Sequence, residues 1–189
     1  MVLLRFDELN AWRESLELYT YTDSDGNKRF NKDTDDIIDE LLDLYLLAYA
    51  DGVTAANMSL DTDIPINDKE IENAIYKRVA GKNFVDRINE YAPVGDIDGI
   101  MRVAETDTTR IYNDGVLNTG KASGKSVLKR WNTMLDDRVR DTHAYLEGMT
   151  VPIDGRFYTY DGDSARYPCD FELAENNCNC RCAIELVDA

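Results

Sequence analysis

Apolar residues in the N-terminal part of the chain recur at the spacing of three and four residues that is typical of amphipathic helices. The pattern predicts helices over residues 3–18, 33–49, 67–91 and 96–117. Polar breaks containing Pro65 and Pro93 separate the later helices. Between the first two helices, residues 19–30 are expected to form a small hairpin or tight loop around Gly26.

After Gly120 the pattern changes to short runs that are typical of strands, at residues 126–128, 149–151, 156–160 and 183–187. The chain is therefore expected to have an α+β fold. A helical N-terminal region of about 118 residues would be followed by a small C-terminal α+β domain with short strands.

Composition changes this picture in one respect, because the formal net charge is −16. Such a charge disfavours binding to nucleic acid, so direct DNA binding is not expected. It fits a well-solvated acidic surface or basic partners. The apolar runs at the N-terminus and at residues 44–50 are too short for a signal peptide or a membrane span, so folding in a reducing cytoplasm is expected.

The chemistry-bearing residues are concentrated near the C-terminus. The single histidine, His143, and the four cysteines, Cys169, Cys178, Cys180 and Cys182, all lie there. In an extended segment the three alternating cysteines would face one side. Thiolates and imidazole are the ligands that zinc selects.

Two interpretations of this cluster stay open. In the first, four of the five residues bind a structural zinc ion, for example His143, Cys169 and two of the alternating cysteines. Such an ion would stabilise a small, loop-rich unit by up to about 10 kcal/mol. In the second, the thiols are simply buried and His143 is hydrogen-bonded to a carboxylate such as Asp136. The neighbouring Arg138, Arg140 and Arg181 are interpreted as partners in arginine–carboxylate pairs that hold irregular loops.

Other motifs do not hold up. Residues 120–126 have a glycine one position away from where a phosphate-binding loop needs it. Residues 23–27 begin like a calcium loop, but Lys28 and Thr34 occupy the positions of its glycine and glutamate. A cysteine–histidine nucleophile is disfavoured because a catalytic thiol is usually single.

The order and spacing of the C-terminal motifs resemble a known family, the phage Mu F-like minor head proteins of the head morphogenesis family. The resemblance covers roughly residues 98–187. It is carried by Trp131, Asp136, Arg138, Arg140, His143, Gly148, Phe157, Tyr167, Pro168 and the final Asn179-Cys180-Arg181-Cys182. Cys169 and Cys178 are additions to the family pattern.

The resemblance implies a bacteriophage minor capsid protein at the portal vertex that assists head assembly or DNA delivery. It would be made in the bacterial host cytoplasm, without enzymatic activity, and would bind the portal or the major capsid protein or associate with itself. It divides the chain into residues 1–95, a helical docking part, and 96–189, the Mu F-like domain. The family's histidine and cysteines have been viewed as a potential metal site.

Alternatives from other classes are a toxin or enzyme domain and a zinc-stabilised nucleic-acid-binding module. The chain ends at Ala189, soon after Cys182, which disfavours an added catalytic domain. The wide apolar face of residues 37–49 is the first candidate for a partner surface. The alternative is that this face packs on residues 3–18.

Overall fold

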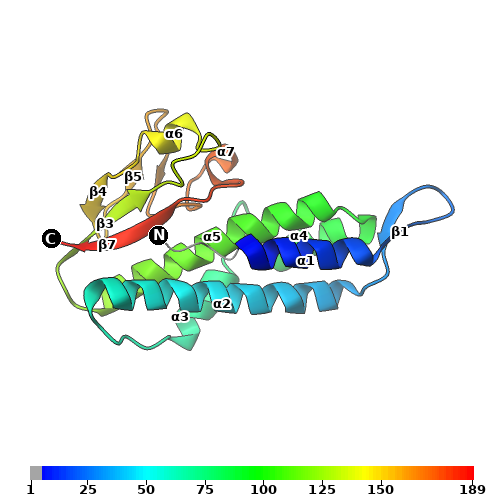
Figure 1. The fold of residues 1–189 in the computed structure, drawn as a ribbon, viewed down its shortest axis with the longest axis horizontal. Coiled ribbons are helices and arrows are strands. Elements are labelled where there is room, and N and C mark those ends of the chain that lie inside the picture. The colour runs from blue at the N-terminus through cyan, green and yellow to red at the C-terminus, as the bar shows by residue number, and fades with distance from the viewer. Residues whose placement is uncertain (1–5) are drawn as a thin grey trace.

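The computed structural model describes residues 6–189, so the start of the predicted first helix, including Leu3, lies outside the described residues. Two long helices, α2 (Thr34–Leu60) and α5 (Ile97–Ala122), lie side by side, and the shorter α1 (Phe6–Leu18) packs beside them (Figure 1). A lobe of short strands sits at one end of this helical layer (Figure 1). The expected α+β fold with a helical N-terminal part is confirmed.

The first helix and the following hairpin agree with the sequence pattern. Leu9, Trp12 and Leu16 of α1 are buried, as their spacing predicts. Strands β1 (Thr20–Thr22) and β2 (Lys28–Phe30) pair in antiparallel fashion. Asp23 accepts hydrogen bonds from the backbone N–H groups of the turn, so it acts there as a turn residue.

The contact between α2 and α5 depends on two glycines. A Cβ atom on Gly52 would lie 2.2 Å from the carbonyl oxygen of Tyr112, and one on Gly115 would lie 2.6 Å from that of Tyr49. The two backbones therefore approach more closely than any larger residue would allow. The sequence pattern predicted that this helix ends at residue 117, but α5 continues to Ala122.

The single helix predicted over residues 67–91 is wrong. The structure has two helices, α3 (Asp68–Ile75) and α4 (Phe84–Tyr91), which are separated by a loop. Ala80 and Gly81 have positive φ angles of 52° and 80°, which a helix cannot contain. Asn83 then starts α4 through a capping box with Asp86. A short 3₁₀ turn, η1 (Ala92–Val94), leads into α5.

The C-terminal lobe contains two small antiparallel sheets. The larger has the order β4 (Thr150–Pro152), β3 (Val127–Asn132), β7 (Ala183–Asp188), and the smaller pairs β5 (Phe157–Tyr158) with β6 (Ser164–Ala165). Two short helices, α6 (Asp141–Ala144) and α7 (Ala174–Asn177), complete the lobe. All four predicted strand regions contain strands, whereas β6 was not expected.

The lobe is attached to the helices through α5. Asn113 of α5 accepts a hydrogen bond from the backbone N–H of Ile184 and donates one to the carbonyl of Cys182. Side chains of α5 also enter both hydrophobic cores, one among the helices and one beneath the sheet. The start of β7 is therefore held directly against the helical layer. Within the described part of the chain, no helix is both long and apolar enough to cross a bilayer.

Candidate metal centre

Three of the five predicted ligands converge in the C-terminal lobe. His143 lies on α6, and Cys180 and Cys182 lie immediately before β7. The Nδ1 atom of His143 is 3.5 Å from the Sγ atom of each cysteine. The three potential ligand atoms lie within 4.8 Å of one another, and all three side chains are buried. The model thus contains a His/Cys/Cys cluster that could bind a metal ion.

The two equal contacts of His143 are informative. A neutral imidazole has one acceptor nitrogen with one lone pair, so Nδ1 can accept only one S–H hydrogen bond. Two thiols at the same distance exceed that capacity. In a tetrahedral zinc site, bond lengths of about 2.3 Å to sulfur and about 2.0 Å to nitrogen place these ligand atoms about 3.5 Å apart. The observed 3.5 Å separations therefore fit ligands of one zinc ion.

The other two cysteines occupy different places. Asn179 has a positive φ of 56°, so the cysteine segment turns and is not the extended strand that was predicted. This turn leaves Cys178 at the end of α7, half-buried and outside the cluster of three. Cys169 is buried beside Cys180, and its thiol lies 3.4 Å from the carbonyl oxygen of Asn177. Cys169 is thus the nearest remaining thiol.

The thiols affect one another's ionisation. Burial opposes ionisation of Cys180, but hydrogen bonds from the thiols of Cys169 and Cys182 and the contact with His143 hold its pKa well below the usual range. The pKa of Cys182 is raised by its hydrogen bond to Cys180 and by burial. Burial likewise raises the pKa of Cys169. Cys180 is therefore the thiol of the group that ionises most readily, and the ionised form is the one that binds metals.

Aromatic side chains enclose the histidine. The ring of Phe171 stacks on His143 at 5.3 Å, and Trp131 of β3 contacts it edge-on at 5.4 Å. Phe157 packs against the other side of Trp131. These rings orient the imidazole and exclude water from the sulfur atoms. Its Nε2 atom is buried without a hydrogen-bond partner among the described residues.

The charged residues near the cluster hold the loops, in part as predicted. Asp136 does not bond to His143 but pairs with Arg181 at 2.7 Å. Arg140 donates hydrogen bonds to the carbonyl groups of Asn176 and Cys178, so it stabilises backbone rather than a carboxylate. Arg138 is mostly exposed.

The strongest arginine–carboxylate pair was missed by the sequence analysis. Arg166 binds both carboxylate oxygens of Asp170, and Lys77 donates to the same carboxylate from the helical part. The spacing of four residues between Arg166 and Asp170 was little signal, because the segment is not helical and such spacing brings side chains together on helices. Lys77 gave none, because it is distant in sequence.

The site's burial indicates its chemistry. A cavity of only about 10 Å³, lined by Arg138, Arg140 and the cluster residues, lies beside it. Such a space does not admit an organic substrate to the sulfur atom of Cys180. A metal bound here would be enclosed by protein ligands, which is the arrangement of a structural site.

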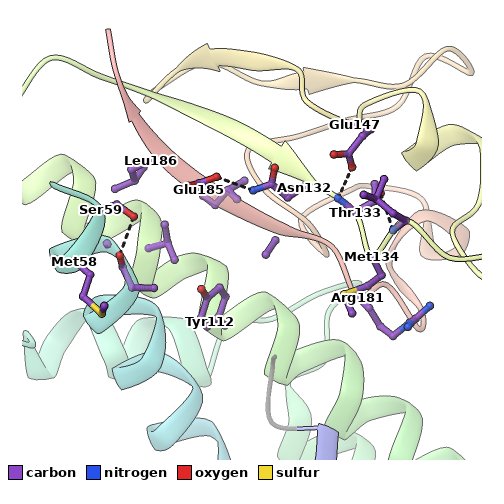
Figure 2. Close-up of a pocket in the computed structure, with 16 residues that line it drawn as sticks. Met58, Ser59, Tyr112, Asn132, Thr133, Met134, Glu147, Arg181, Glu185 and Leu186 are labelled. Carbon is purple, nitrogen blue, oxygen red and sulfur yellow. Dashed lines mark hydrogen bonds between the residues drawn. The ribbon is translucent and has the colours of Figure 1, made fainter. Parts of the chain in front are cut away.

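A larger cleft lies between α2, α5 and β7, outside the His/Cys cluster. Figure 2 shows Met58 and Tyr112 on the helical side and Leu186 on the sheet side, with Glu147 near the top of the view and Arg181 lower down, below Met134. Its volume is about 450 Å³, and its lining is mostly apolar. Glu147 accepts a hydrogen bond from the backbone N–H of Thr133, so this carboxylate helps to hold the loop after β3.

Comparisons with known proteins identify the family of the chain. The family model of phage Mu protein F like proteins matches residues 68–185, from α3 to β7, and so begins before residue 98. The chain is 35% identical over 92 residues to the NAD(+)–arginine ADP-ribosyltransferase EFV of Enterococcus faecalis, which covers 47% of this chain and 19% of the transferase. It is 31% identical over 86 residues to the Minor head protein GP7 of Bacillus phage SPP1, which covers 44% of this chain and 28% of that protein. The chain therefore spans less than a third of the length of either relative. No solved structure matches the chain.

Proposed function

The chain belongs to the phage Mu protein F like family, and from that premise we propose that it is a structural component of a bacteriophage head. The observation that carries this proposal is the similarity to a phage minor head protein over 86 residues. We place the protein at the portal vertex, where it assists head assembly or DNA delivery by binding the portal or the major capsid protein. Residues 1–95 would form the docking part and residues 96–189 the Mu F-like domain.

The portal assignment is tested by co-expression with the portal protein of the same phage. The expected result is co-purification of the two proteins through size-exclusion chromatography. Replacing Leu46 and Leu47 by serine tests the proposed docking face, since these side chains are 40% and 45% exposed on α2. The expected result is loss of co-purification without loss of the folded state, which circular dichroism would monitor. Retained co-purification would exclude this face, and lost folding would exclude its docking role.

Leu46 and Leu47 are exposed because α2 packs on the rest of the protein through its opposite face. Tyr45, Ala48 and Tyr49 are buried, and α2 packs mainly against α5. Residues of α1 share the same core, and Trp12 donates a hydrogen bond to Glu40 of α2. The apolar face of residues 37–49 is thus divided into a buried stripe and an exposed strip.

We further propose that His143, Cys180 and Cys182 hold a structural zinc ion, with Cys169 as the fourth ligand. Support comes from the two equal Nδ1–Sγ separations, together with the lowered pKa of Cys180. The ion would supply cross-links between α6, the loop around Cys169 and the start of β7. It would have no catalytic part, because the cluster is enclosed.

Elemental analysis of the purified protein tests the zinc proposal. About one zinc per chain is expected in the wild type and in Cys178→Ser, which serves as the matched control because Cys178 lies outside the cluster. His143→Ala and Cys182→Ser are expected to lose the metal. Full zinc content in His143→Ala would remove that residue from the ligand set, and a zinc-free wild type would refute the proposal.

An enzyme is the rival function, because the Enterococcus faecalis relative is named as an ADP-ribosyltransferase. The chain matches only 19% of that protein, so the matched part need not carry its activity. We propose that the chain is not an enzyme. Incubation with labelled NAD⁺ and an arginine-containing acceptor peptide should transfer no label, and saturable transfer would overturn this proposal.

A further inference from the structure

A basic cavity of about 250 Å³ lies between α4, α5 and α7. Five cationic side chains line it, whereas Asp107 and Glu172 are its only carboxylates among the described lining residues. The cations are Lys77, Lys82, Arg87, Arg102 and Arg110. This local excess of positive charge is unexpected in a chain with a net charge of −16.

Arg110 forms the floor of the cavity. Its side chain is 1% exposed, its Nε atom donates to Asp107, and its Nη1 atom donates to the carbonyl oxygen of Ala74. Its Nη2 atom is buried and has no hydrogen-bond partner among the described residues. The hydroxyl of Thr106, one turn earlier on α5, is also buried without a described partner. Leaving such donors unsatisfied is costly, so they indicate a missing acceptor.

The remaining cations are available in different degrees. Arg87 donates to the backbone carbonyl of Val79, a neutral acceptor that leaves its positive charge uncompensated. Neither Arg87 nor Arg102 is in an ion pair of the described residues, whereas Lys77 pairs with Asp170 and Lys82 with Glu90. The two arginines therefore contribute most of the uncompensated field in the cavity.

We propose that this cavity binds a phosphate group. Several guanidinium groups from different helices favour an anion whose oxygens accept hydrogen bonds in several directions, and arginine forks match phosphate geometry. The volume exceeds that of the bare ion, so the group can be inorganic phosphate or the phosphate of a mononucleotide. Long nucleic acid is disfavoured by the acidic charge of the rest of the chain. This inference depends neither on the head assignment nor on zinc.

Calorimetric titration of the full chain with inorganic phosphate, at constant ionic strength set with chloride, tests the proposal. Saturable binding is expected, and Arg87→Gln and Arg102→Gln should each weaken it about tenfold. Arg29→Gln on β2 removes the same charge at a residue that does not line the cavity, and it should leave binding unchanged. Circular dichroism would establish that each variant is folded. Absence of saturable binding, or equal binding by Arg87→Gln and Arg29→Gln, would overturn the proposal.

A second titration distinguishes inorganic phosphate from the phosphate of a nucleotide. A nucleoside 5′-monophosphate that competes with inorganic phosphate, while the parent nucleoside does not, would assign the site to a nucleotide phosphate. Binding of inorganic phosphate alone would assign it to the free ion. Competition by the uncharged nucleoside would contradict recognition through phosphate.

Discussion

Replacing Asp170 by asparagine should destabilise the protein strongly, although the change removes only one charge. The carboxylate is 9% exposed and accepts hydrogen bonds from the guanidinium and backbone N–H of Arg166 and from Lys77. Lys77 belongs to the loop after α3, so this one carboxylate joins the helical part to the C-terminal lobe. Burial alone would raise its pKa, but the hydrogen bonds from Arg166 and the charge of Lys77 hold it well below its usual range.

The size of the effect follows from burial. Removing one partner of a buried ion pair costs about 3–5 kcal/mol, because the remaining charges lose their compensation. Lys77 and Arg166 are 27% and 40% exposed, so water can solvate part of their charge. We therefore expect a loss of about 3 kcal/mol in the free energy of unfolding. For a chain of this length that lowers Tm by roughly 6–12 °C.

Urea denaturation at neutral pH measures this loss, with Asp154→Asn as the matched control. Asp154 pairs with Lys121 at 2.8 Å but is 77% exposed, so its removal should cost much less than removal of the buried Asp170 carboxylate. The folded-state pKa of Asp170 is depressed, so its contribution is present above the unfolded pKa of about 4 and is lost as pH falls through the folded value. The difference between wild type and Asp170→Asn should shrink accordingly on acidification. Equal losses for the two variants at neutral pH would refute the reasoning.

Three further predictions concern the helix contact, the buried lysine and the metal. Gly115→Ala should lower the free energy of unfolding by about 2 kcal/mol, because a clash with the Tyr49 carbonyl outweighs the gain of about 1 kcal/mol in helix propensity. In Gly120→Ala the new methyl group meets only flexible side-chain ends, so this variant should be nearly as stable as the wild type. Thermal denaturation compares the two variants, and equal effects would contradict the clash. Burial lowers the pKa of Lys129 to about 8, so above that pH the unfolded chain binds more protons than the folded one. The free energy of unfolding of the wild type should therefore rise by about 2 kcal/mol relative to that of Lys129→Met between about pH 7 and 9.5. No such gain should appear relative to a variant of the exposed Lys121, and a pH-independent difference would exclude the effect. Chelation should lower the stability of the wild type by an amount on the order of 5 kcal/mol but leave His143→Ala unchanged, and an equal response of both proteins to the chelator would argue against the zinc site.

The sequence predicted the elements whose residues alternate in a regular way. The buried stripe of α1 and the strand regions of the lobe follow from local spacing. The break between α3 and α4 was missed, because it depends on the left-handed conformation of Ala80, a residue that usually favours helix. The role of Gly115 was also missed, because close approach of two helices is a property of their packing and has no local signal.

The sequence indicated the kinds of residue that form the candidate metal site, but not which of the five candidates come together. The concentration of His143 and the cysteines indicated a cluster, and the structure brings three of the five residues together. Alternation alone suggested that Cys178 would join Cys180 and Cys182, but the turn at Asn179 prevents this. The basic cavity gave no signal, since its cations come from segments that only the fold makes neighbours.

The continuous helix α5 has a consequence for how the molecule loses its structure. Its residues Ile100 and Ala104 belong to one core, and Val116 and Leu117 belong to the other. When either half of the protein opens, part of α5 is therefore exposed to water. Fraying of one half therefore weakens the other, and denaturation should proceed as a single cooperative transition. A protein built in this way would transmit a pull on its N-terminal helices along a stiff axis to the sheet, without an intervening hinge.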